Sequence, residues 1–186
     1  FPVLRVLVDR PSAPAQFLIL GSASPDLIRG AAETLAGRVA FVHLSGFDVT
    51  ETGSEHADRL WERGGFPMSF LAPDDTASYA WRQDFIETFP SIDQKTASRY
   101  VDILCGAFLV RRLPPWFENV GKRVVKAPKI YLRDSGLLHA LLGLRNGGEL
   151  RSHPRYGASW EGFALEYVVS LLKAEREAYF WATHGG

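Results

Sequence analysis

Two residues near the start of the chain have the type and position that nucleotide chemistry needs. Ser22 follows the apolar run at residues 17–20, and Arg38 follows Gly37 at the end of the next segment. A hydroxyl just past a buried strand can bond to a γ-phosphate or to the attacking water. An arginine at a helix exit can stabilise charge on a phosphate. The alternatives are that Ser22 only begins and caps the turn, and that Arg38 only satisfies the helix dipole.

A second group of residues suits nucleic acid. The stretch RRLPPWFENVGKRVVKAPK, residues 111–129, holds six basic residues and one acid, Glu118, with Trp116 and Phe117 among them. Cations neutralise phosphates and aromatic rings stack on bases, so this basic ribbon and the helix before it predict nucleic-acid binding. The residues assigned to that interface are Lys95, Arg99, Lys122, Arg123 and Lys126. A solvated strand-and-turn face explains the same composition.

Acidic side chains in the last third suggest another kind of chemistry. Glu161 and Glu166 flank the apolar stripe of a long helix, and Asp134 follows a strand. Carboxylates placed on a helix and beside strands can bind a divalent metal. So few isolated acids favour plain solvation of the helix over a metal site.

Several motifs that would fix a function are absent from the sequence. The Gly121-Lys122 pair is followed by Arg123 and not by Ser or Thr, so it is not a P-loop. Neither a Gly-x-Ser-x-Gly elbow nor a His-Glu-x-x-His pair is present. The five histidines are scattered and are expected at the surface or at the edge of the core. Cys105, the one cysteine, excludes an internal disulfide and fits a reducing cytoplasm.

The elements expected to position these residues begin with a strand, a helix and a strand at 17–20, 24–37 and 39–44. Short joins between them predict a parallel α/β sheet. Residues 45–75 are acidic and contain a Gly-Gly-Phe-Pro turn. The further elements are predicted as helices at 77–89, from 94, at 133–143 and at 160–172, strands at 108–113, 129–132 and 178–183, and a loop at 145–156.

The composition limits the classes of function. At 186 residues and 46% hydrophobic, the chain can bury a core in one or two domains. Its formal net charge is zero, so the overall composition does not indicate binding to a polyanion or to a membrane surface. Only local clusters of charge could provide such binding. No apolar run approaches the ~20 residues of a membrane span, so a cytoplasmic protein is expected. Because the first residue is Phe1 and not Met, and because the last predicted helix and strand have no predicted partners after them, we expect truncation at both ends.

Four stretches together resemble a known family. They are FLILGSASPDLIRGAAETLAGRVAFVHLSGF, LWERGGFPMSFLA, LVRRLPPWFENVGKRVVKAPKIYLRDSGLLHALLG and GASWEGFALEYVV. They look like prokaryotic AAA-type ATPases, P-loop ATP-binding proteins that carry a C-terminal restriction-endonuclease-like domain of unknown function. The likeness covers most of the chain in the family's order.

The resemblance implies an α/β fold in three segments. Residues 1–72 would be the C-terminal part of the P-loop ATPase parallel sheet, 73–115 a helical, remnant winged-helix segment, and 116–186 the α/β start of the endonuclease-like domain. Several dozen family residues between residues 89 and 90 would be missing from this chain, and they would form most of the winged-helix segment.

The resemblance also assigns roles to residues. Ser22 and Arg38 would be the catalytic residues that sense and stabilise the γ-phosphate, and Glu161 would be the nuclease-like helix carboxylate. ATP and Mg²⁺ would bind in the intact protein, through a P-loop and an acidic strand upstream of Phe1. This chain alone is expected neither to hydrolyse ATP nor to cut DNA, nor to bind a cofactor tightly.

Two alternatives to the ATPase fragment stay open. One is a nucleic-acid-binding module that uses the basic ribbon, and the other is a degenerate protein that only binds other proteins. The expected partners are ATP, DNA, and other copies of the chain in a homo-oligomer, with no membrane among them.

Overall fold

The computed structural model describes residues 2–10, 16–20, 34–40, 42, 44–88, 97–116, 127–175 and 177–181, with the backbone alone for 97–100. The elements within these ranges are α1 (Pro2–Val8), α3 (Val49–Thr52), η1 (Ser54–His56), α4 (Ala57–Arg63), α5 (Pro67–Phe70), α6 (Asp75–Glu87), α7 (Ala97–Gly106), β1 (Val110–Leu113), β2 (Lys129–Leu132), α8 (Ser135–Leu141), α9 (Gly147–Ser152) and α10 (Tyr156–Leu171).

The described part of the chain is mainly helical and carries one two-stranded antiparallel sheet. In that sheet Val110 lies opposite Leu132 and Leu113 lies opposite Lys129. Helix α7 precedes β1 and contacts it. The predicted strand at 178–183 is represented, as far as residue 181, by a single parallel bridge between Phe180 and Pro115.

The parallel sheet predicted for the N-terminal third is not seen among the described residues. Residues 17–20 form no strand, and their side chains are 44–86% exposed. Val42 and Leu44, from the predicted second strand, are also exposed and without strand pairing. The prediction took an apolar run for a covered strand, but a strand needs neighbours to bond its backbone groups. The described ranges place no strand beside these residues.

The predicted helix at 24–37 falls mostly outside the described residues, and only its end can be compared. Thr34 is helical, and Gly37 adopts φ 73°, the left-handed conformation in which many helices end. The Arg38 N–H donates to the Leu35 carbonyl at 2.8 Å and closes the final turn. The predicted exit at Gly37 is therefore confirmed.

Most of the later elements agree with the sequence, and the differences have local causes. Helix α10 starts four residues earlier than the predicted 160, and α9 lies inside the predicted loop at 145–156. In α9 the Asn146 side chain accepts a hydrogen bond from the Glu149 N–H at 3.0 Å, and this cap supports a short helix. A capping box of Asp48 and Glu51 likewise starts α3 within the acidic region.

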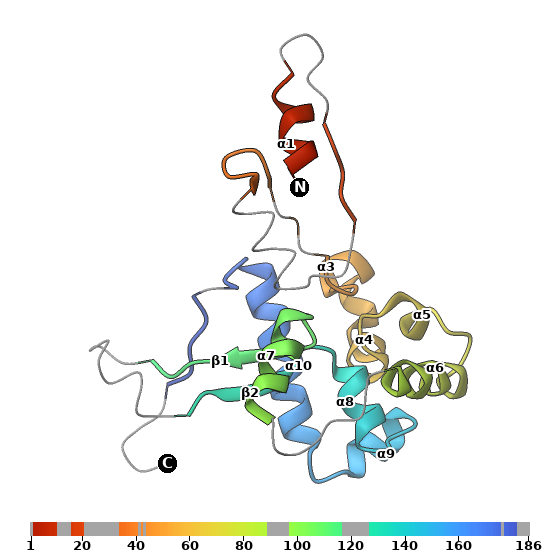
Figure 1. The fold of residues 1–186 in the computed structure, drawn as a ribbon. Helices are drawn as coiled ribbons and strands as arrows, with labels where there is room; N and C mark the ends of the chain where they lie inside the picture. The colour runs from red at the N-terminus through yellow and green to blue at the C-terminus, as the bar shows by residue number, and fades with distance from the viewer. Residues whose placement is uncertain are drawn as a thin grey trace.

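The hydrophobic core lies where helices from distant parts of the sequence meet. Trp61 of α4 packs with Leu144 and Leu150, and Phe163 of α10 covers them. Helix α8 contacts α4, α6 and α10, so residues from the expected segments 1–72, 73–115 and 116–186 pack together. In Figure 1 these helices form one body, whereas α1, which has no buried residue, stands apart from it.

A close approach of two loops fixes the start of α8. The Asp134 carboxylate accepts hydrogen bonds from the Leu137 N–H at 2.8 Å and from the Gly65 N–H at 2.7 Å. Gly64 has φ 79°, and a Cβ there would lie 2.1 Å from Oδ1 of Asp134. Glycine is therefore required at 64 both by the backbone conformation and by the space available.

We expect Gly64→Ala to lower the free energy of unfolding by about 3 kcal/mol, because it adds a clash to a left-handed conformation. Gly143→Ala is the matched control, since Gly143 has φ 76° and a Cβ added there would meet nothing within 4 Å. The control should lose only about 1 kcal/mol. Urea denaturation of both variants measures the difference, and equal losses would show that the Asp134 contact costs nothing.

Candidate functional site

Arg38 is the one predicted catalytic residue within the described ranges. Its Nε donates to Oδ1 of Asp9 at 2.7 Å and its Nη1 donates to the Ala36 carbonyl at 3.1 Å. The arginine side chain is 35% exposed and that of Asp9 is 44% exposed. The guanidinium therefore lies at the surface, and an exposed ion pair of this kind is weak enough to exchange for another anion.

The other predicted residues differ in what the structure describes. Arg99 lies on α7, where its backbone is described, and Glu161 lies on α10. The remaining assigned residues, outside the described ranges, are Ser22, Lys95, Lys122, Arg123 and Lys126.

Glu161 contacts β2, not a second acid. Its Oε1 accepts hydrogen bonds from the Tyr131 hydroxyl at 2.6 Å and from Lys129 Nζ at 3.4 Å. The Tyr131 hydrogen bond holds the pKa of Glu161 below its usual value. Among the residues the structure describes, no three His, Cys, Asp or Glu side chains come together to hold a metal ion.

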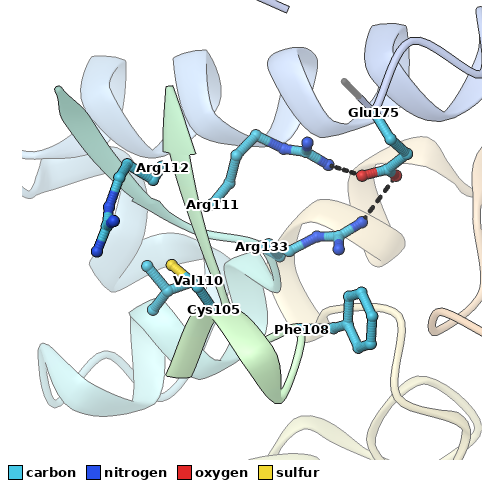
Figure 2. Close-up of a pocket in the computed structure, with 7 residues that line it drawn as sticks. All are labelled: Cys105, Phe108, Val110, Arg111, Arg112, Arg133 and Glu175. Atoms are coloured by element: carbon cyan, nitrogen blue, oxygen red, sulfur yellow. Dashed lines mark hydrogen bonds and ion pairs between the residues drawn. The ribbon is translucent and has the colours of Figure 1, made fainter. Parts of the chain in front are cut away.

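Two arginines and two glutamates form an ion-pair network beneath the sheet. Arg111 of β1 binds both Glu166 oxygens and donates from Nη2 to Oε2 of Glu175 at 3.0 Å. Arg133 donates to Oε2 of Glu166 at 3.0 Å and to Oε1 of Glu175 at 3.1 Å. Figure 2 shows Arg111 of β1 and Arg133, which follows β2, both reaching Glu175. The four formal charges of the network cancel. Because Glu166 lies on α10, its ion pairs fasten the sheet to that helix.

The described cations of the basic ribbon are all paired with carboxylates. Arg111 is paired with Glu166, and Lys129 is paired with Glu161. Arg112 pairs with Asp102 of α7 at 2.5 Å. The hollow of about 250 Å³ that Figure 2 draws is lined by three arginines, yet each of them is already neutralised. These side chains therefore do not provide an open phosphate-binding surface.

The sequence contained a signal for the buried role of Arg111 that the composition of the ribbon concealed. In the strand predicted at 108–113 the residues Leu109, Arg111 and Leu113 alternate, so the pattern puts them on one face. Leu113 and Arg111 are both buried, whereas Arg112 is exposed. An arginine on the same face as the buried Leu113 needs an acid to compensate its charge, and the half-buried Glu166 is that acid.

We expect Glu166→Gln to lower the free energy of unfolding by about 2–4 kcal/mol, because it leaves the buried Arg111 with less compensating charge. Asp102→Asn, which breaks the exposed pair with the neighbouring Arg112, should cost less than about 0.5 kcal/mol. Thermal or urea unfolding measures both. Similar small losses would mean that water compensates the Arg111 charge.

A buried serine and histidine lie in the core beside Trp61. His139 Nε2 is 2.6 Å from Ser159 Oγ, and Trp61 Nε1 donates to the same Oγ at 3.0 Å. His139 Nδ1 lies 3.0 Å from the Glu62 carbonyl. A carbonyl oxygen can only accept, so Nδ1 carries the proton and Nε2 accepts from the serine hydroxyl.

The Ser159–His139 pair has the separation of a nucleophile and its base, but its surroundings favour a structural role. Ser159 is 1% and His139 is 2% exposed. The indole N–H occupies a lone pair of the serine oxygen. Burial lowers the pKa of His139 to about 4, so the imidazole is neutral at neutral pH and links α8 to α10.

We expect the stability of the protein to fall as the pH is lowered from about 6.5 toward 4. In that window the unfolded chain binds a proton at His139 that the folded chain excludes, which costs about 2 kcal/mol at pH 5. Urea titrations near pH 7 and pH 5 should show a smaller difference for His139→Gln. An imidazole pKa near 6.5 in the folded wild-type protein, measured by NMR, would contradict the assignment.

Comparison with known proteins gives two kinds of match. Residues 89–147 match a family described as a domain of unknown function (DUF8612), and this segment contains α7, β1, β2 and α8. The chain is also 48% identical to the uncharacterized protein Rv2008c of Mycobacterium tuberculosis (strain H37Rv) and to the uncharacterized protein Mb2031c of Mycobacterium bovis (strain AF2122/97). No solved structure matches the chain.

The two mycobacterial alignments show how the lengths compare. Each covers 98% of this chain and 50% of the relative, so the chain spans about half the length of these curated relatives. Each alignment is 223 residues long against a chain of 186, a difference of 37. The relatives therefore carry at least that many residues, within the aligned region, that have no counterpart here.

Proposed function

We propose that this chain supplies Ser22 and Arg38 to the nucleotide site of an AAA-type ATPase. The observation that carries the proposal is the exposed apolar run at 17–20, which ends two residues before Ser22 in the sequence. Four consecutive apolar residues that are 44–86% exposed are costly, since fully burying one side chain of this size gains about 1.5–3 kcal/mol and much of that gain is missing here. Neighbouring strands of an ATPase core sheet, contributed by residues outside these 186, would cover them.

The position of Arg38 supports the same proposal. The left-handed Gly37 ends the preceding helix and leaves the guanidinium at the surface, with Asp9 as its charged partner. An arginine that is accessible and held only by an exposed carboxylate can turn toward the phosphate of a nucleotide, in its own or in a neighbouring subunit. The described residues do not by themselves form an ATP or Mg²⁺ site, so this chain alone is proposed to be inactive.

The proposal is tested by ATP hydrolysis, with this chain compared with a form extended through any coding sequence upstream of Phe1. We expect hydrolysis only in the extended form, where Arg38→Ala lowers kcat at least about 100-fold and leaves ATP affinity nearly unchanged. Asp9→Asn is the control, because it breaks the ion pair and keeps the arginine. An equal loss in Asp9→Asn would show that Arg38 acts only through Asp9, and an extended form without ATP binding would refute the proposal.

Nucleic-acid binding remains the second candidate, because α7 is followed by an antiparallel pair of strands. In the sequence, the connection between Leu113 and Lys129 contains Lys122, Arg123 and Lys126, and a basic connection between two such strands is the pattern expected of a winged helix. If the ATPase test fails, duplex DNA added to the same preparations separates the alternatives. Binding that weakens steeply between about 50 mM and 200 mM salt would favour the ribbon.

A further inference from the structure

A cavity of about 490 Å³ lies between β2, α8 and α10. Its apolar wall includes Ile130, Leu132, Leu138, Leu142 and Phe163. The volume falls within the range of about 300–1,000 Å³ that small-molecule sites occupy. Ile130 and Leu142 remain 49% and 37% exposed, so an apolar ligand placed there would remove hydrophobic surface from water.

The polar side chains around the cavity already have partners. The Ser135 hydroxyl donates to the Trp61 carbonyl at 2.7 Å, and the Tyr131 hydroxyl donates to Glu161. Ser159 is engaged by His139 and Trp61. These hydroxyls have no proton left to donate, so the cavity offers little to a sugar or another ligand rich in hydroxyl groups.

Among the described residues that line the cavity, Arg155 alone carries a charge. Its guanidinium makes no hydrogen bond or ion pair with the described residues, and no acidic side chain lines the cavity beside it. Arg155 also precedes α10, whose first turn contains no acidic residue, so the local field is positive. One unpaired cation at an apolar cavity complements a ligand with one anionic group and an apolar body.

We propose that this cavity binds a small amphiphilic carboxylate. The apolar body of the ligand lies against Ile130, Leu132 and Phe163, and its carboxylate pairs with Arg155. A carboxylate suits the planar guanidinium, which can donate two parallel hydrogen bonds to it. The proposal is independent of the ATPase proposal, because it rests on different residues.

Isothermal titration with decanoate, decanol and decylammonium tests the proposal on the whole chain, below the concentrations at which these compounds form micelles. Decanoate should bind about tenfold more tightly than decanol, and decylammonium should bind most weakly. Arg155→Gln should reduce decanoate binding to the level of decanol. Arg145→Gln is the matched control, since that exposed arginine pairs with Glu149 and does not line the cavity.

A second variant tests the location of the site. A Cβ at Gly162 would lie 3.5 Å from the Tyr131 ring, so alanine fits there, and Gly162→Leu should fill the cavity and abolish binding of both decanoate and decanol. Unchanged decanoate affinity in Arg155→Gln would overturn the carboxylate assignment. Absence of decanoate binding up to about 1 mM would overturn the ligand site itself.

Discussion

The arrangement of the helices depends on one buried hydroxyl, that of Ser159. Its oxygen accepts a hydrogen bond from the indole N–H of Trp61 and its proton is donated to His139 Nε2, so a single hydroxyl joins α4, α10 and α8. The same indole ring packs against Trp160 at 4.9 Å and Tyr156 at 5.1 Å between centroids. Because each buried donor has one acceptor, a shift of any of these helices would leave a polar group unpaired in the core. Polar pairing therefore selects one packing among those that apolar contact alone would permit.

Arg82 extends this constraint to α6. It is 2% exposed, and its guanidinium donates to the Gly136 carbonyl at 2.9 Å, the Ser78 carbonyl at 3.2 Å and the Glu62 carbonyl at 3.3 Å. Burial lowers the pKa of Arg82, while the nearby Asp134 opposes that change. Through these bonds one side chain connects α6 with α4 and α8. The sheet is held differently, by ion pairs that run from Arg111 and Arg133 to α10 and the residues after it. The body therefore combines a hydrogen-bonded core with an ionic attachment at one face.

Local signals in the sequence predicted the elements better than they predicted the partners of the side chains. The strand at 129–132 and the left-handed end at Gly37 follow from β propensity and from the freedom of glycine, which need no knowledge of the rest of the fold. The role of Arg111 depends on Glu166, 55 residues away, and composition alone placed that arginine in a nucleic-acid ribbon. The run at 17–20 failed as a strand for a related reason, since strand formation depends on neighbours that periodicity does not reveal.

Charged side chains near the N-terminus and those around α8 and α10 differ in whether they are already paired and buried. Around α8 and α10 most charged and hydroxyl side chains are consumed by contacts that hold helices together, as with Glu166, Arg82 and Ser159. A group that is already paired and buried can change partners only at the cost of stability, so it is a poor candidate for chemistry. Near the N-terminus the opposite holds, because Arg38 has one exposed partner and the apolar residues at 17–20 are uncovered. Arg38 is therefore accessible to a ligand at low cost in stability, whereas the paired and buried groups of the helical body are not.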